Sequence, residues 1–217
     1  MPLQLAILAS GSGTNAQAMI DKARSGLLDV KICLIASNNP KAQVLERAKN
    51  AGIPYIALDH KAYESRDAFD QDMADHVLRS GAEAVALAGY MRLLSKTFLT
   101  AFRGPILNLH PALLPSFPGL HGGDDAMQYG VKISGATVHF VDEKMDNGPV
   151  IIQAAVPVNP GESTDDLMTR IHAMEHRIYP QAIEWLAEKR LSTQGRKVYL
   201  KEGNARRQPV DGDFFVW

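Results

Sequence analysis

The chain has 217 residues, of which 46% are hydrophobic and 22% are charged, as in an ordinary globular protein. Its 23 basic and 24 acidic residues give a formal net charge of -1, which excludes a broad electrostatic attraction to nucleic acid or to an anionic membrane. A single cysteine, Cys33, excludes an internal disulfide framework, and no apolar run reaches the length that spans a bilayer, so we expect a cytoplasmic protein.

The first hundred residues alternate short apolar runs with longer amphipathic stretches. In chain order we predict a strand at Leu3–Ala9, a helix at Asn15–Arg24, a strand at Val30–Ala36, a helix at Lys41–Asn50, a strand at Ile53–Leu58, a helix at Tyr63–Arg79 and a strand at Glu83–Ala88. The last helix should bury Phe69, Met73, Val77 and Leu78. This alternation predicts an α/β fold, doubly wound and Rossmann-like, with a mostly parallel sheet and helices on both faces.

The second half has a different pattern. We predict a strand at Pro105–Leu109, a proline-rich segment at Pro111–Gly119, paired strands at Ala136–Val141 and Val150–Val158 around an acidic loop, and a helix at Thr164–Lys189 that Ser163 or Thr164 caps. No repeat is visible, so we expect one domain over 1–217 with a phosphate-binding half at 1–100, a folate and catalytic half at 101–190 and an unassigned tail at 191–217.

A glycine-rich turn follows the first strand and opens the first helix. It reads GSGTNA over Gly11–Ala16, where Thr14 and Asn15 add side-chain donors. Glycines let the backbone approach a ligand closely, and the free N–H groups of a helix N-terminus attract an anion. A dinucleotide site expects an acidic residue after the second strand, but Ala36–Pro40 contains none. The turn therefore favours a phosphate ester over a nicotinamide cofactor, with a plain tight turn as the alternative.

Two polar residues interrupt the apolar strand before the proline-rich segment. Asn108 and His110 lie two residues apart, so both side chains point to the same side of the strand, and Pro111 keeps the chain extended after them. Ligands of open parallel sheets bind beyond the carboxyl ends of the strands, which is where this pair lies. The alternative is a histidine satisfied in the core beside an asparagine that forms a turn.

These residue types suit acyl transfer to an amine. An amide N–H and an imidazolium can stabilise the oxyanion that forms when an amine attacks a formyl carbon. A carboxylate from the acidic loop Asp142–Gly148 can orient the imidazole and accept the proton that the amine releases. No activated serine or cysteine is needed because the amine is the nucleophile, and the sequence contains no GxSxG motif.

Six segments between residues 3 and 190 carry a resemblance to a known family. They are SGSGTN at Ser10–Asn15, ESRDAFD around Arg66, AGYMRLL at Ala88–Leu94, ILNLHPALLPSFPGLH at Ile106–His121, GATVHFVDEKMDNGPVI at Gly135–Ile151 and MEHRIYP at Met174–Pro180. Each segment alone is a weak signal, but their ordered occurrence is specific. On these motifs the sequence resembles the glycinamide ribonucleotide formyltransferases of purine synthesis.

The resemblance implies transfer of the formyl group of 10-formyltetrahydrofolate to the amine of glycinamide ribonucleotide, giving tetrahydrofolate as the second product. It implies a catalytic trio of Asn108, His110 and Asp146, with His110 as the acid. It implies ribonucleotide contacts by Gly13, Thr14, Asn15 and Glu175. It implies folate contacts by Arg66, Met91, Arg92, Leu93, Leu94, Asn108, Val141, Asp142 and Glu143, the last three in the loop Val141–Asp146. No metal, nucleic acid or membrane is expected, and the protein should be a monomer or a homodimer.

Two sister activities share the trio. Formyltetrahydrofolate deformylase, a hydrolase, carries an extra N-terminal regulatory domain and a His-His pair where this chain has His110-Pro111. Methionyl-tRNA formyltransferase is longer and carries a tRNA-binding domain. One departure from the resemblance is that many relatives have a second histidine shortly after His121, whereas this chain has Gly122-Gly123-Asp124.

Two further interpretations come from other classes. A nucleotide-binding Rossmann-like module without transfer activity would explain the glycine-rich turn but not the trio. A zinc site at His172 and His176 has both rings on one helix face but lacks an HExxH motif and an evident third ligand. Aromatic residues of the tail are expected to pack rather than bind a cofactor, namely Tyr199, Phe214, Phe215 and Trp217.

Overall fold

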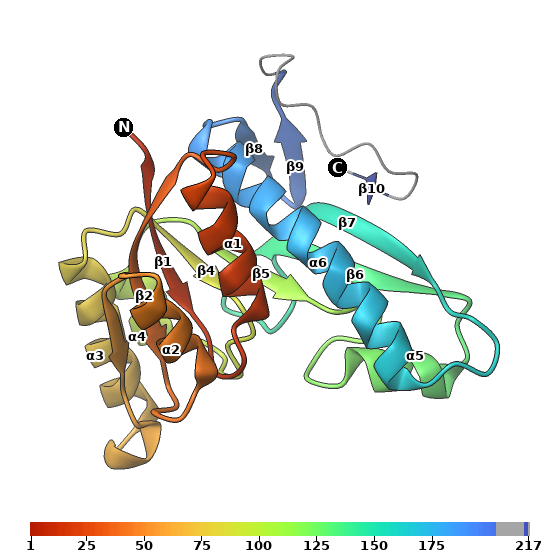
Figure 1. The fold of residues 1–217 in the computed structure, drawn as a ribbon, viewed down its shortest axis with the longest axis horizontal. Helices are drawn as coiled ribbons and strands as arrows, with labels where there is room; N and C mark the ends of the chain where they lie inside the picture. The colour runs from red at the N-terminus through yellow and green to blue at the C-terminus, as the bar shows by residue number, and fades with distance from the viewer. Residues whose placement is uncertain (203–214, 217) are drawn as a thin grey trace. The chain divides into compact units, whose positions relative to one another are not determined.

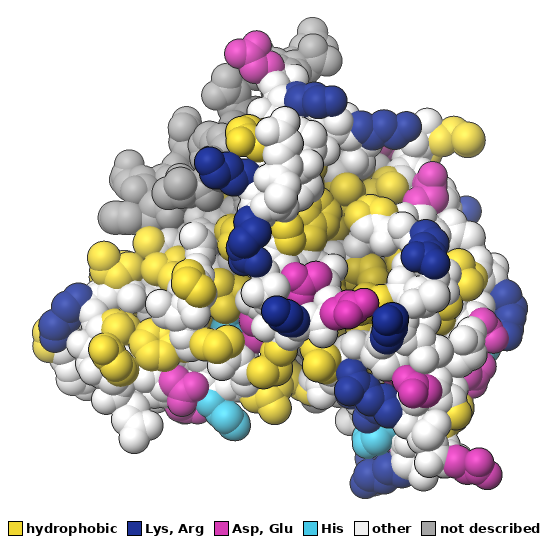
Figure 2. Space-filling view, turned by 180° about the vertical axis from the view of Figure 1, so that it is seen from behind, with side chains coloured by type: hydrophobic (Ala, Val, Ile, Leu, Met, Phe, Trp, Pro, Cys, Tyr) yellow, Lys and Arg dark blue, Asp and Glu magenta, His cyan; other side chains and the backbone are white. Residues whose placement is uncertain are grey.

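The computed structural model describes residues 1–202 and 215–216. The chain divides into two compact units, unit 1 at Met1–Leu107 and unit 2 at Asn108–Trp217. No helix in the described part of the chain is long and apolar enough to cross a membrane. Figure 2 shows Lys and Arg side chains interspersed with Asp and Glu on the face that it presents, as a net charge near zero leads one to expect.

Unit 1 is built on a parallel sheet (Figure 1). Its strands lie in the order β3 (Tyr55–Ala57), β2 (Val30–Ser37), β1 (Leu3–Leu8) and β4 (Ala84–Leu87), and each neighbouring pair is parallel. The central strand β1 buries Leu5, Ile7 and Leu8 completely, because helices cover both faces of the sheet. A further strand, β5 (Ile106–His110), begins at the end of this unit, and the backbone N–H of Val85 donates to the carbonyl of Pro105 at 3.0 Å.

Helices cover both faces of this sheet. They are α1 (Thr14–Arg24), α2 (Gln43–Asn50), α3 (Arg66–Arg79) and α4 (Lys96–Ala101), with a short 3-10 helix, η1, at His60–Ala62. Figure 1 shows α1 and α2 on one face and α3 and α4 on the other. The predicted α/β fold with a doubly wound, parallel sheet is therefore confirmed.

The third predicted helix differs from the structure at its start and on its inner face. It begins at Arg66 rather than Tyr63, because the Ser65 side chain caps it by accepting the backbone N–H of Ala68 at 3.1 Å. The prediction that Leu78 faces the core is wrong, because this side chain is 46% exposed. Asp70 lies on the inner face instead and is 1% exposed, since its carboxylate accepts the backbone N–H of Ser95 at 2.6 Å.

The strands of unit 2 form both parallel and antiparallel pairs. After β5 come α5 (Gly122–Tyr129), β6 (Ile133–Phe140), β7 (Val150–Pro157), α6 (Thr164–Ala187), β8 (Leu191–Gln194), β9 (Lys197–Leu200) and β10 (Phe215–Val216). β6 and β7 form the predicted pair, which is antiparallel, and β9 runs parallel to β7. β8 pairs antiparallel with β9, and β10 pairs antiparallel with β7. The helices α4 and α5 and the strands of the tail were not predicted.

The long helix α6 packs on β6 and β7 (Figure 1). It starts with a capping box, in which Ser163 accepts the backbone N–H of Asp166 at 3.2 Å and the Asp166 carboxylate accepts the backbone N–H of Ser163. Its inner face buries Ile171, Tyr179 and Trp185. In the tail, Tyr199 is exposed rather than packed, and Phe214 and Trp217 lie outside the described residues.

Candidate active site

The strand β5 presents Asn108 and His110 at its carboxyl end, as their alternation predicts. The side chain of His110 is 4% exposed. Its ring nitrogen Nε2 lies 2.8 Å from the carbonyl oxygen of Phe117, in the proline-rich segment that follows the strand. Because a carbonyl oxygen only accepts, Nε2 carries a proton in this arrangement, and the opposite nitrogen, Nδ1, is left to face a carboxylate.

Asp146 lies in the loop between β6 and β7 and adopts a positive φ of 49°. The Asp142 carboxylate shapes this loop, because it accepts the backbone N–H of Lys144 and the side-chain amide of Asn147, each at 2.8 Å. Gly148 closes the loop: a Cβ at this position would lie 1.6 Å from the carbonyl oxygen of Phe140. Only glycine fits there, and the loop brings Asp146 back to His110 on β5.

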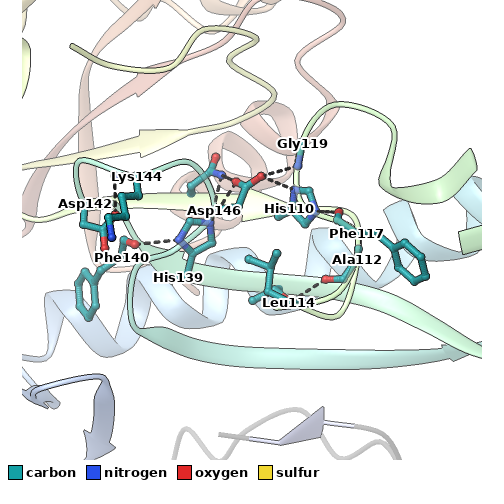
Figure 3. A network of polar contacts seen from close by, with 12 residues as sticks. His110, Ala112, Leu114, Phe117, Gly119, His139, Phe140, Asp142, Lys144 and Asp146 are labelled. Carbon is teal, nitrogen blue, oxygen red and sulfur yellow. Dashed lines mark hydrogen bonds and ion pairs between the residues drawn. The ribbon is translucent and has the colours of Figure 1, made fainter. Parts of the chain in front are cut away.

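The three predicted catalytic residues converge in unit 2 (Figure 3). The Asp146 Oδ2 atom lies 3.5 Å from His110 Nδ1 and accepts the backbone N–H of Gly119 at 2.8 Å. The other carboxylate oxygen, Oδ1, accepts the side-chain amide of Asn108 at 3.4 Å. An amide, an imidazole and a carboxylate thus meet at the carboxyl end of one strand.

A second imidazole, which the sequence interpretation missed, joins this group. His139 Nε2 lies 3.2 Å from Asn108 Nδ2 and 3.7 Å from Asp146 Oδ1. Its Nδ1 lies 2.8 Å from the carbonyl oxygen of Phe140, so Nδ1 carries a proton, and Nε2 faces the amide of Asn108 and the carboxylate of Asp146. The signal was present in the sequence, since Thr137 and His139 are polar residues two apart in the otherwise apolar run Ala136–Val141.

The electrostatics of Asp146 favour its ionised form. Burial by itself would raise the pKa of this carboxyl. The hydrogen bond with His139, the N–H of Gly119 and the charges of His110 and His139 outweigh burial and hold the pKa below its usual value. The carboxylate is therefore charged at neutral pH, where it can orient His110 and accept a proton.

Buried polar groups hold the proline-rich segment in place. The Thr137 hydroxyl donates to the carbonyl of Ala112 at 2.6 Å and accepts the backbone N–H of Leu114 at 3.1 Å. The Gln153 side-chain amide donates to the carbonyl of Leu114 at 2.9 Å. These bonds fix the chain that supplies the Phe117 carbonyl and the Gly119 N–H to the catalytic group.

In unit 1, the predicted phosphate loop lies at the start of α1. Gly13 is the residue before the helix and has φ 71°. A Cβ on Gly13 would lie 2.5 Å from Val44 Cγ2, so only glycine fits there. The loop is tied to α2, because the carbonyl of Gly11 accepts the backbone N–H of Val44 at 3.2 Å and that of Ser12 accepts Arg47 Nε at 2.7 Å. Thr14, the first helical residue, is exposed.

The predicted folate segment Met91–Leu94 lies in the loop after β4, residues 89–95. Arg66 donates to the carbonyl of Leu93, so this guanidinium holds the loop from α3. Arg92 lies over the ring of Phe69, 4.7 Å from its centroid. Met91 and Leu93 are exposed, while Leu94 is buried and Arg92 is partly buried.

The remaining predicted residues belong to unit 2. Glu175 is buried on α6, Val141 and Asp142 are partly buried, and Glu143 is exposed. The predicted ribonucleotide and folate residues are thus divided between the two units, while the catalytic trio lies within one. In the described residues no group of three or more His, Cys, Asp or Glu side chains could hold a metal ion, so the His172–His176 pair has no third ligand there.

Known proteins resemble the chain over most of its length. The α/β fold and the linked amide, imidazole and carboxylate at the end of β5 suit an enzyme of the group-transfer class. A family profile described as formyl transferase matches residues 3–183. The chain belongs to the formyl transferase family.

Among its relatives is the phosphoribosylglycinamide formyltransferase of Escherichia coli strain K12, which is 39% identical over 210 residues, 97% of this chain and 98% of that protein. The enzyme of the same name from Bacillus subtilis strain 168 is 40% identical over 84% of this chain and 94% of its own length. The trifunctional purine biosynthetic protein adenosine-3 of Drosophila pseudoobscura pseudoobscura is 44% identical over 85% of this chain, but the chain spans 14% of that protein.

Solved structures agree with this assignment. The crystal structure of glycinamide ribonucleotide transformylase 1 from Symbiobacterium toebii superposes with a TM-score of 0.91 and is 47% identical, covering 93% of this chain and 95% of that one.

Proposed function

We propose that this protein transfers the formyl group of 10-formyltetrahydrofolate to the amine of glycinamide ribonucleotide, a step of de novo purine synthesis. The observation that carries the proposal is the convergence of Asn108, His110 and Asp146 at the end of β5. The relatives that bear this activity in their names are matched over 98% and 94% of their length, which supports the same substrates here.

The reaction begins when the substrate amine attacks the formyl carbon and an oxyanion forms. The Asn108 amide has two N–H groups, and the longer of its two described contacts is the 3.4 Å bond to Asp146. The developing oxyanion can replace that weak bond and receive the amide N–H. The His110 imidazolium supplies a second stabilising charge and then the proton for the departing folate nitrogen.

Asp146 has two tasks in this scheme. Its Oδ2 keeps His110 in one orientation through the 3.5 Å contact with Nδ1. The carboxylate enters the reaction charged, because its pKa is held below the usual value. As the base of the site it can accept a proton from the ammonium of the tetrahedral intermediate, directly or through water. The nucleophile is the substrate's own amine, so no covalent enzyme intermediate is required.

Predicted binding groups are found in each unit. The exposed start of α1 offers backbone N–H groups and the Thr14 hydroxyl to the phosphate of the ribonucleotide. Glu175 would contact the same substrate. The exposed Met91 and Leu93 and the loop Val141–Asp146 would contact the folate. We further propose that the protein acts in the cytoplasm as a monomer or a homodimer, with these two small molecules as its ligands and without a metal.

One experiment separates this function from its alternatives. Purified protein receives 10-formyltetrahydrofolate with and without glycinamide ribonucleotide, and tetrahydrofolate release is followed by absorbance. Release that depends on the ribonucleotide supports the transferase. Release without it identifies a deformylase-like hydrolase, and no release, together with calorimetric binding of nicotinamide nucleotides, identifies a nucleotide-binding module.

A further inference from the structure

Ser10 joins the two loops of unit 1 that we propose bind the two substrates. It lies two residues after β1, directly before the glycine-rich turn. Its hydroxyl accepts the backbone N–H of Met91 at 2.8 Å, and its backbone N–H donates to the carbonyl of Gly89 at 3.0 Å. The phosphate loop and the loop at 89–95 therefore share one residue.

The hydroxyl of Ser10 is held in a single orientation. A serine hydroxyl has one proton, and here it is donated to Asn38 Oδ1 at 2.5 Å. The lone pairs of the oxygen are then left to face the N–H of Met91. Asn38 is itself buried, and its carbonyl oxygen lies 3.1 Å from His60 Nδ1. The interior of the unit thus fixes the direction in which Ser10 accepts.

The loop at 89–95 is anchored independently at its far end. Arg66 donates to the carbonyl of Leu93, and the carboxylate of Asp70 accepts the backbone N–H of Ser95 at 2.6 Å. Both residues belong to α3, on the opposite face of the sheet from α1. Movement of the phosphate loop can therefore reach this loop at its near end through Ser10, which bonds to the carbonyl of Gly89 and to the N–H of Met91.

We propose that Ser10 is a positioning residue that couples the occupancy of the ribonucleotide loop to the affinity for the folate. The inference rests on the proposed function. A phosphate bound at the start of α1 would restrain Gly11–Asn15 and with them the position of Ser10. The Ser10 hydroxyl, already oriented by Asn38, would then hold Met91 and the exposed Leu93 ready for the folate. By linkage, a bound folate raises the affinity for the ribonucleotide by the same factor.

The test measures the dissociation constant of tetrahydrofolate by calorimetry, with and without saturating glycinamide ribonucleotide. Tetrahydrofolate carries no formyl group, so the ternary complex does not react. In the wild-type protein we expect the ribonucleotide to tighten folate binding by about 5-fold or more, the lower range of coupling between sites. In Ser10→Ala we expect this factor to fall close to 1, while each ligand alone binds within about 5-fold of wild type.

Three variants make the result specific to the hydroxyl contact. Ser10→Thr keeps the hydroxyl and should restore the coupling. Ser10→Cys keeps the volume with a weak hydrogen-bonding group, so it should show intermediate coupling and serves if the alanine variant does not fold. Ser37→Ala is the matched control: Ser37 is buried at the end of the neighbouring strand β2, and its hydroxyl bonds to the carbonyl and the N–H of Asn39 rather than to Met91. It should keep the wild-type factor.

The outcomes separate this inference from the proposed function. The inference is wrong, and the proposed function stands, if the wild-type protein binds both ligands but the ribonucleotide leaves the dissociation constant of tetrahydrofolate unchanged. The same holds if Ser10→Ala keeps the wild-type coupling factor. If Ser37→Ala loses the coupling as Ser10→Ala does, the effect is general loosening of the strand ends and the inference is again wrong. If the wild-type protein binds neither ligand, the proposed function fails first.

Discussion

The two units hold their candidate functional groups in different ways. In unit 1 the proposed phosphate loop is formed by the backbone: Gly13 supplies a left-handed conformation, and Thr14, the first residue of α1, is exposed. In unit 2 the groups are side chains, and His110 and Asp146 are 4% and 9% exposed. A site formed by the backbone should be sensitive to substitutions that add a Cβ and hardly sensitive to changes of charge. A site formed by side chains should be sensitive to the loss of single atoms of its buried polar groups.

The largest effect should follow from removing charge in the side-chain site. Asp146→Asn or His110→Ala should lower the transfer rate by about 10²–10⁴-fold, because positioned acid–base groups contribute on this scale. Steady-state turnover with both substrates measures it, and circular dichroism checks the fold. Asp29→Asn makes the same chemical change at an exposed position of unit 1 and should leave the rate unchanged. Near-normal turnover in both active-site variants would falsify their assignment.

The second effect concerns the backbone site and compares two glycines of one loop. In Gly13→Ala the new Cβ would lie 2.5 Å from Val44 Cγ2 and 3.0 Å from Val44 Cα, at a φ of 71°. We expect a loss of about 1–2 kcal/mol from the left-handed conformation and about 1–3 kcal/mol from overpacking. Gly11→Ala meets no atom within 4 Å and should stay within about 0.5 kcal/mol of wild type in urea unfolding. Equal stability of the two variants would show that Gly13 tolerates a side chain.

Gly13 is a poor position at which to test ribonucleotide binding by the proposed phosphate loop. A bulky residue at Gly13 disturbs the packing on Val44, so it cannot report on ligand binding alone. The exposed hydroxyl of Thr14 is the better probe.

Thr14→Ala should weaken the ribonucleotide and spare the folate. A hydrogen bond to a charged group contributes about 1.5–3 kcal/mol, so we expect the KM for glycinamide ribonucleotide to rise by about 10–100-fold. The KM for the folate should stay within about twofold, and stability should not fall because alanine favours a helix. Thr100→Ala, an exposed threonine of α4, is the matched control. An equal rise in both KM values would contradict the phosphate-loop role.

The sequence predicted the fold of unit 1 well because parallel strands buried on both faces read as unbroken apolar runs. It failed where tertiary contacts outweigh local pattern. Asp70 is buried through its bond to Ser95, whereas the apolar Leu78 faces solvent one position beyond the inner stripe. The helix α5 was missed because it opens with Gly122 and Gly123, poor helix formers that allow close packing: a Cβ on Gly123 would lie 2.5 Å from Met168 Sδ.

The candidate site was predictable in part, for a similar reason. Alternation in β5 was enough to pair Asn108 with His110, since both lie on one strand. Asp146 came from the family resemblance, because only the course of a loop with a positive φ carries its carboxylate to the strand. His139 was missed, although two polar residues at alternate positions in an apolar strand indicate a buried polar contact. The hydroxyl of Thr137 and the ring of His139 both make such contacts.

The smallest effect, and the sharpest contrast between the two units, is the pH dependence of stability. The pKa of Asp146 is lower in the folded protein than its unfolded value of about 3.9, so its stabilising contribution is complete above that value. The contribution is lost as the pH falls through the folded pKa, and Asp146→Asn lacks it at every pH. The gap in unfolding free energy between wild type and this variant should therefore narrow as the pH is lowered from 7 toward 3.

Urea unfolding at several pH values measures this gap, and the other acidic groups cancel in the difference because both proteins carry them. Gly13→Ala serves as the comparison from unit 1. Its cost arises from a Cβ contact and a backbone conformation, neither of which titrates, so its gap to wild type should stay constant over the same pH range. A gap for Asp146→Asn that stays constant or widens toward low pH would mean that burial outweighs the hydrogen bonds of His139 and Gly119, and that the carboxyl is not held in its charged form.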